Sequence, residues 1–132
     1  MDIESIAKEV VYSAVHVHRT MGPGLFKSAY QKCLCFELRK RGLRVDCEVL
    51  LPIIYDGYTI ESGYQLDMLV ENMIVIENKT VDDFAPIHAA QLLTYLRLGG
   101  YHIGFLINWK VVLLKDGIKR LVNPAFKPKP EK

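Results

Sequence analysis

Two consecutive apolar segments constrain the fold of this chain most: Tyr-Gln-Leu-Asp-Met-Leu-Val at residues 64–70 and Met-Ile-Val-Ile-Glu-Asn-Lys at residues 73–79. Only two residues separate them. Segments of this composition favour β-strands, and so short a link predicts an antiparallel hairpin. Both strands carry charge within an otherwise apolar pattern, with Asp67 in the first and with Glu77 and Lys79 at the end of the second.

The length of the link decides whether these charges meet. Glu77 and Lys79 are two residues apart, so their side chains leave the same face of a strand. In an antiparallel pair, residues that face each other point the same way. A two-residue turn would place Val70 opposite Met73, and Asp67 would then point away from Glu77. We therefore predict a three-residue loop or a β-bulge, because either one brings the two acids to the same face.

An acid on one strand, followed by acid-x-lysine on the next, can hold a divalent cation and activate a water. This is the chemistry of metal-dependent phosphodiester cleavage. A Mg²⁺ or Mn²⁺ ion needs only one or two protein carboxylates, here Asp67 and Glu77, and the carbonyl of Asn78 is a further candidate ligand. Lys79 would orient the water or neutralise charge on the phosphate. The alternative is a surface hairpin with an exposed acid and a same-face Glu77–Lys79 pair.

Apolar residues at helical spacing predict three helices, over residues 3–20, 25–41 and about 87–98. The first ends at the breaker Met21-Gly22-Pro23-Gly24. The expected apolar positions of the third helix include Ala90, Leu93 and Leu96.

The other apolar segments predict further strands, over residues 44–55, 58–60, 102–108 and 111–115, with a loop at 61–63. The order is α-α-β-β-β-α-β-β, which indicates an α/β fold with a mixed central β-sheet flanked by helices. We expect one domain over residues 1–123, followed by a flexible basic C-terminal tail over 124–132.

Two residues of the third helix are candidate supporting residues. Gln91 and Tyr95 are four residues apart and share a helical face, and the helix begins shortly after Lys79. They would hydrogen-bond phosphates or the water, or else form polar contacts with the sheet. His88, one turn before Gln91, would either join the site or be a structural histidine.

The chain has no apolar run of the roughly 18 residues that a membrane span needs, and its start carries no basic signal-peptide region. We expect a cytoplasmic protein with no membrane association. Three cysteines, Cys33, Cys35 and Cys47, cannot form a closed disulfide set and are expected to be reduced.

Beyond these features, the chain resembles the GxxExxY proteins, a small bacterial group in the PD-(D/E)xK nuclease-like superfamily. The resemblance extends from about residue 3 to residue 122. The matching stretches are residues 22–25, Tyr30, Leu34, 37–43, Asp67, 76–79, His88, 90–93, 95–96, Gly104, 106–108 and 117–120.

The resemblance implies a restriction-endonuclease-like core and a nuclease that acts on DNA or, less readily, RNA. It implies Asp67, Glu77 and Lys79 as the catalytic set. The spacing of Gln91 and Tyr95 is similar to the QxxxY element of RecB-like nucleases. Whether the chain acts alone or as a homodimer stays open.

One departure from the family pattern concerns Lys27, which stands where the family name asks for glutamate. A lysine ammonium close to Asp67 and Glu77 would occupy the place of the cation. Otherwise Lys27 would contact the phosphate of a nucleic acid. Two functions follow: an active metal-dependent nuclease, or a catalytically impaired nuclease-like domain that binds nucleic acid or protein.

Overall fold

The N-terminal helix forms where its apolar stripe predicts. In the computed structural model, which describes residues 1–128, helix α1 covers Ile3–Met21. The Asp2 carboxylate caps its start by accepting a hydrogen bond from the N–H of Ser5 over 2.8 Å. Gly22 ends it in a left-handed conformation (φ 74°) that a glycine adopts without strain. The buried face of α1 includes Ile6, Val10, Ala14 and Val17.

The remaining elements follow the predicted order. They are α2 (Lys27–Lys40), β1 (Val45–Tyr55), β2 (Tyr58–Val70), β3 (Ile74–Lys79), α3 (Pro86–Gly99), β4 (Ile103–Asn108), the short 3₁₀ helix η1 (Leu114–Asp116) and β5 (Ile118–Val122). The five strands form a sheet in the order β1-β2-β3-β4-β5, with β3 and β4 parallel and the other neighbours antiparallel. The predicted α/β fold with a mixed sheet is confirmed. Of the expected tail, residues 129–132 lie outside the described part of the chain.

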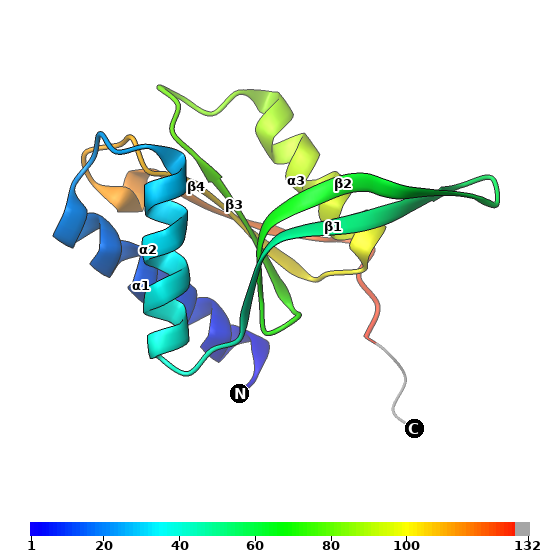
Figure 1. The fold of residues 1–132 in the computed structure, drawn as a ribbon, viewed down its shortest axis with the longest axis horizontal. Helices are drawn as coiled ribbons and strands as arrows, with labels where there is room; N and C mark the ends of the chain where they lie inside the picture. Colours follow the sequence, from blue (N-terminus) through cyan, green and yellow to red (C-terminus); the bar gives the residue numbers. More distant parts are fainter. Residues whose placement is uncertain (129–132) are drawn as a thin grey trace.

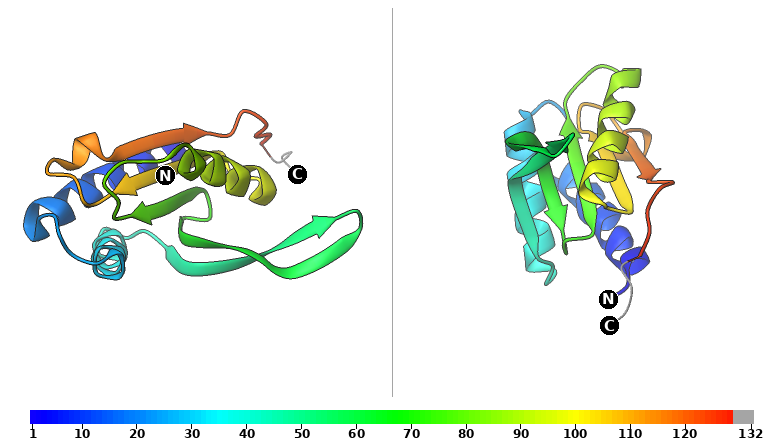
Figure 2. Two further views of the ribbon diagram at one scale, coloured as in Figure 1. Left: turned by 90° about the horizontal axis from the view of Figure 1, so that it is seen from above. Right: turned by 90° about the vertical axis from the view of Figure 1, so that its right-hand side faces the viewer.

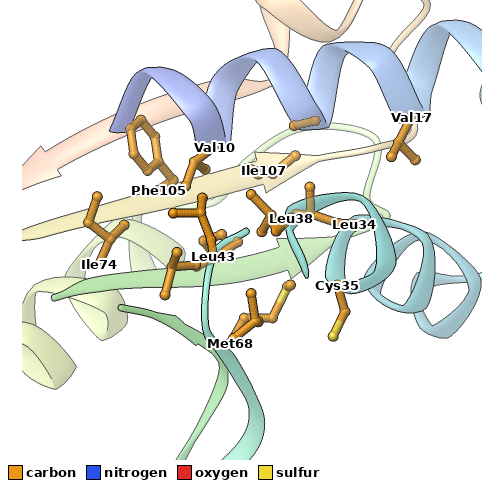
Figure 3. Close-up of a cluster of buried hydrophobic side chains, with 14 of the residues drawn as sticks. Val10, Val17, Leu34, Cys35, Leu38, Leu43, Met68, Ile74, Phe105 and Ile107 are labelled. Carbon is orange, nitrogen blue, oxygen red and sulfur yellow. The ribbon is translucent and has the colours of Figure 1, made fainter. Parts of the chain in front are cut away.

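Helices cover both faces of this sheet (Figures 1 and 2). One core lies between the sheet and helices α1 and α2, and Figure 3 shows it with Val10, Leu34, Leu38, Met68 and Ile107 converging. The second core lies under α3. It consists of Tyr64, Leu66, Leu69, Val75, Leu92, Leu96 and Leu106.

The hairpin between β2 and β3 has the predicted register. Met68 faces Ile76 and Val70 faces Ile74, so three residues form the loop. Two of these, Glu71 and Asn72, are left-handed, with φ of 50° and 55°. The three-residue loop is thus confirmed, and it brings the two candidate acids to the same face.

Two strand predictions are wrong. Residues 61–63 are part of β2, which pairs with β1 as a long hairpin that projects from the rest of the molecule (Figure 1). Two extra residues on β2 are absorbed as a register shift between Leu51 and Ile53 of β1, so no loop is needed. Residues 111–115 are not a strand, because β4 pairs instead with Ile118–Val122. Trp109 and Lys110 form a turn directly after β4, and the Trp109 side chain is fully buried there.

The expected apolar face of α3 is also partly wrong. Leu92 and Leu96 are its buried residues, whereas Ala90 and Leu93 are exposed. The helix therefore lies rotated from the predicted stripe. Within residues 1–128, no helix combines the length and the apolar character that crossing a membrane would require.

Candidate functional site

The candidate acids Asp67 and Glu77 lie side by side on β2 and β3. The main-chain N–H of Asp67 donates a hydrogen bond to Oε2 of Glu77 over 2.8 Å. The main-chain N–H of Asn78 donates to Oδ2 of Asp67 over 2.8 Å. Both side chains are buried. Because each carboxylate is bonded to the backbone of the opposite strand, the hairpin itself holds the two acids in place.

The negative charge of this pair is only partly compensated. Burial, together with the neighbouring Asp67 carboxylate, raises the pKa of Glu77 to about 7. The hydrogen bond from Asp67 and the positive charges of Lys79 and Lys27 act in the opposite direction. Lys79 ends β3 two residues after Glu77, so strand geometry puts the two side chains on the same face of the sheet. Close to neutral pH, Glu77 is therefore present in both protonated and ionised forms.

Lys27 contacts this acid pair from the first turn of α2. Its ammonium nitrogen lies 3.0 Å from Oδ1 and 3.0 Å from Oδ2 of Asp67. The expected approach of Lys27 to the acids is thus observed. The Lys27 side chain remains 42% exposed, so solvent reaches it.

A chain of buried hydrogen bonds runs behind the acids. Trp109 Nε1 donates to Oδ1 of Asn78 over 2.9 Å, and Asn78 Nδ2 donates to Oε1 of Gln31 over 3.2 Å. Gln31 Nε2 donates to Oε1 of Glu48 over 2.7 Å and lies 3.4 Å from the main-chain oxygen of Asp67. Side chains from α2, β1, β3 and the end of β4 thereby fix the back of the site.

This network adds residues that the sequence reasoning missed. Gln31 follows Lys27 by four residues, so helical spacing alone indicates that the two share a face. Trp109 and Glu48 carry no comparable local signal, because their partners are distant in the chain. The network also engages the side chain of Asn78, which leaves its main-chain carbonyl, the group expected from the sequence, as the candidate ligand.

Tyr95 lies within reach of the charge on the acids. Burial raises the pKa of Tyr95, and the negative charges of Glu77 and Asp67 raise it further. Its ring packs against that of Tyr64, with 5.0 Å between the centroids. Gln91 is half-buried one turn earlier on α3, and its part in the site stays a prediction.

His88 has a structural task at the start of α3. Its Nδ1 accepts a hydrogen bond from the main-chain N–H of Ala85 over 3.0 Å. Its ring also packs edge-on against Phe84, with 6.1 Å between the centroids. These contacts match the alternative of a structural histidine.

The donor set at the acids fits a hard divalent cation such as Mg²⁺ or Mn²⁺. Two adjacent carboxylates are sufficient protein ligands when water and phosphate complete the shell. Within residues 1–128, no group of three or more His, Cys, Asp or Glu side chains is placed to hold a metal ion, so water and phosphate would have to supply the other ligands. A bound cation would also stabilise the ionised form of Glu77. Binding at Asp67 would require the ammonium of Lys27 to move aside.

Two comparisons relate this chain to known proteins. A family model described as the PD-(D/E)XK nuclease superfamily matches residues 4–121. A solved structure described as "Crystal structure of SSO0001" is similar, with a TM-score of 0.51 and 25% sequence identity over 94% of this chain. The chain spans 61% of the length of that structure's chain. Comparison with curated proteins gives no match. On the extent of the family match, the chain belongs to the PD-(D/E)XK nuclease superfamily.

Proposed function

We propose that the chain hydrolyses phosphodiester bonds of nucleic acid, with DNA as the first substrate to test, in a reaction that depends on Mg²⁺ or Mn²⁺. The observation that carries the proposal is the pair of buried carboxylates of Asp67 and Glu77 on neighbouring strands, with the main-chain N–H of Asp67 donating to the Glu77 carboxylate over 2.8 Å. These carboxylates and the main-chain carbonyl of Asn78 would hold the cation. When bound, the cation would polarise the phosphodiester and lower the pKa of a water.

The other side chains would act on the substrate. Lys79, beside Glu77, would place its ammonium against the attacking water or a phosphate oxygen. Tyr95 remains protonated at neutral pH because its pKa is raised, so its hydroxyl is available as a hydrogen-bond donor. Gln91 would offer a second donor from the same face of α3.

The contact of Lys27 with Asp67 favours a second candidate function. An ammonium 3.0 Å from both oxygens of Asp67 neutralises that carboxylate and takes the position that a cation would need. A chain that kept this pair intact would bind nucleic acid or protein without cleaving it.

Calorimetric titration with MgCl₂ and MnCl₂, beside cleavage assays on labelled DNA, distinguishes the two functions. The first function predicts metal binding and cleavage by the natural chain, with both lost in Asp67→Asn. Asp116→Asn, at an exposed position, is the matched control. DNA binding without metal binding or cleavage would instead identify a binding module.

A further inference from the structure

Phe26, the residue before Lys27, holds a large apolar ring in solvent next to the candidate site. The ring is 85% exposed, more than any other large hydrophobic residue within residues 1–128. Isolated apolar side chains on a surface are common and do not by themselves define a binding site. The argument therefore rests on how this ring is held and on what surrounds it.

The loop that carries the exposed ring is fixed. The Tyr30 hydroxyl donates to the main-chain oxygen of Gly22 over 2.5 Å and accepts from the N–H of Leu25 over 3.1 Å. The Tyr30 ring stacks on Trp109 with 4.8 Å between centroids and 7° between planes. Trp109 in turn bonds to Asn78, which directly follows the acid of β3. The loop is thus joined through buried side chains to the site itself.

Cationic side chains lie near each end of this loop. Lys27 of the candidate site directly follows Phe26. At the other end, Gly22 and Pro23 line a pocket of about 510 Å³. Arg19 and Lys115 also line this pocket. An exposed aromatic ring on a loop with cations near each end matches the requirements of a single-stranded nucleic acid, because cations attract its phosphates and a ring stacks on its bases.

We propose that Phe26 stacks on an unpaired base of the substrate, so that the site acts on single-stranded or frayed nucleic acid. This inference rests on the proposed function and names its substrate class. Away from its ends, an intact duplex has every base already stacked between its neighbours, so Phe26 has no free base face to contact there. Arg19 and Lys115 would hold phosphates of the nucleotides that continue past the ring.

The test uses the whole chain and measures binding separately from cleavage. Fluorescence anisotropy with labelled oligothymidine, oligouridine and a blunt DNA duplex is recorded in EDTA, which prevents metal-dependent cleavage. Phe26→Ala should weaken single-strand binding about 10-fold, as expected for one lost base–aromatic stack, and should leave duplex binding unchanged. Phe26→Trp should retain the single-strand affinity of the natural chain. The melting temperature of Phe26→Ala should stay that of the natural chain, since the ring is in solvent.

Phe36 provides the matched control. It lies on the same helix and is 70% exposed, but it is more than two helical turns from Lys27. Unchanged single-strand affinity in Phe26→Ala, or an equal loss in Phe36→Ala, would overturn the inference, as would a natural chain that binds no oligonucleotide. Phe26-dependent binding without cleavage in MgCl₂ or MnCl₂ would remove the nuclease proposal and leave the stacking role standing. The two oligonucleotides decide between DNA and RNA.

Discussion

The ammonium of Lys27 and the carboxylate of Asp67 form a symmetric ion pair, with Nζ 3.0 Å from each carboxylate oxygen. The pair leaves Glu77 as the less compensated acid, and burial next to Asp67 raises its pKa to about 7. A divalent cation at Asp67 would therefore compete with Lys27 for the same oxygens. The outcome of that competition decides between the two functions considered above.

Substitution of Lys27 should change metal affinity and stability in opposite directions. Lys27→Glu should raise Mn²⁺ affinity about 10-fold, because a competing cation is removed and a carboxylate is added. It should lower the metal-free stability by about 1 kcal/mol, a modest figure because solvent screens this partly exposed pair. Calorimetry and thermal melting in EDTA measure the two effects, with Lys119→Glu on β5 as control. If neither quantity changes, Lys27 does not compete with the metal.

The raised pKa of Glu77 predicts a specific pH dependence of stability. In the folded chain the protonated form is favoured, so the stability linked to this group is present below its ordinary pKa of 4.5 and is lost as pH rises through about 7. Glu77→Gln, which cannot ionise, should therefore exceed the natural chain in metal-free stability at pH well above 7, by up to about 3 kcal/mol. Thermal melting in EDTA, from below pH 4.5 to well above pH 7, measures the stability of both chains, with Glu61→Gln as control. A stability difference between Glu77→Gln and the natural chain that does not vary with pH would contradict the prediction.

Lys79 should affect cleavage more than metal binding. Lys79→Ala should lower the cleavage rate by a factor on the order of 10²–10³, as is typical when one donor to developing charge is lost. Its Mn²⁺ affinity should hold or rise slightly, because a positive charge near Glu77 is removed. Single-turnover cleavage and calorimetry on the same preparation make the measurement, and Lys119→Ala is the control. A parallel loss of metal affinity would assign Lys79 to the structure of the site instead.

Tyr30 should stabilise the loop that carries Phe26. Tyr30→Phe keeps the stacking on Trp109 but removes both hydrogen bonds to the loop, at a cost of about 1–3 kcal/mol. Thermal melting measures this cost, and limited proteolysis should show faster cleavage between Gly22 and Phe26. Tyr58→Phe, in an exposed position, should alter neither. Unchanged proteolysis in Tyr30→Phe would mean that other contacts hold the loop.

Local patterns predicted the helices, the mixed sheet and the meeting of the two acids. The hairpin register followed from strand geometry once Asp67 and Glu77 were required to share a metal site. Helix α1 could be predicted equally well, because its apolar stripe and the residues that begin and end it are close together in the sequence. The position of Lys27 beside Asp67 followed from the family resemblance.

The features that the sequence did not reveal depend on contacts between distant residues. Residues 61–63 look like a loop, but they continue β2 at its register shift, between residues that pair with β1 on either side. The hydrogen bond from Trp109 to Asn78 has no local signal, because the two residues are far apart in the chain. Which face of α3 is buried depends on the apolar residues of the sheet against which it packs. Ala90 and Leu93 do not lie on that buried face.

The number of residues in the loop between β2 and β3 decides which face of the sheet each side chain of β3 points to. At present Ile74 and Ile76 face α1 and α2, while Val75 faces α3. If one residue between Val70 and Ile74 were lost, the side chains of β3 would exchange faces. Glu77 would then point into the apolar core under α1 and α2, and an isoleucine would point to the face that now carries Asp67. A change of two residues would restore the arrangement. Parity of loop length, rather than the identity of the loop residues, is thus what natural or engineered variation has to preserve here.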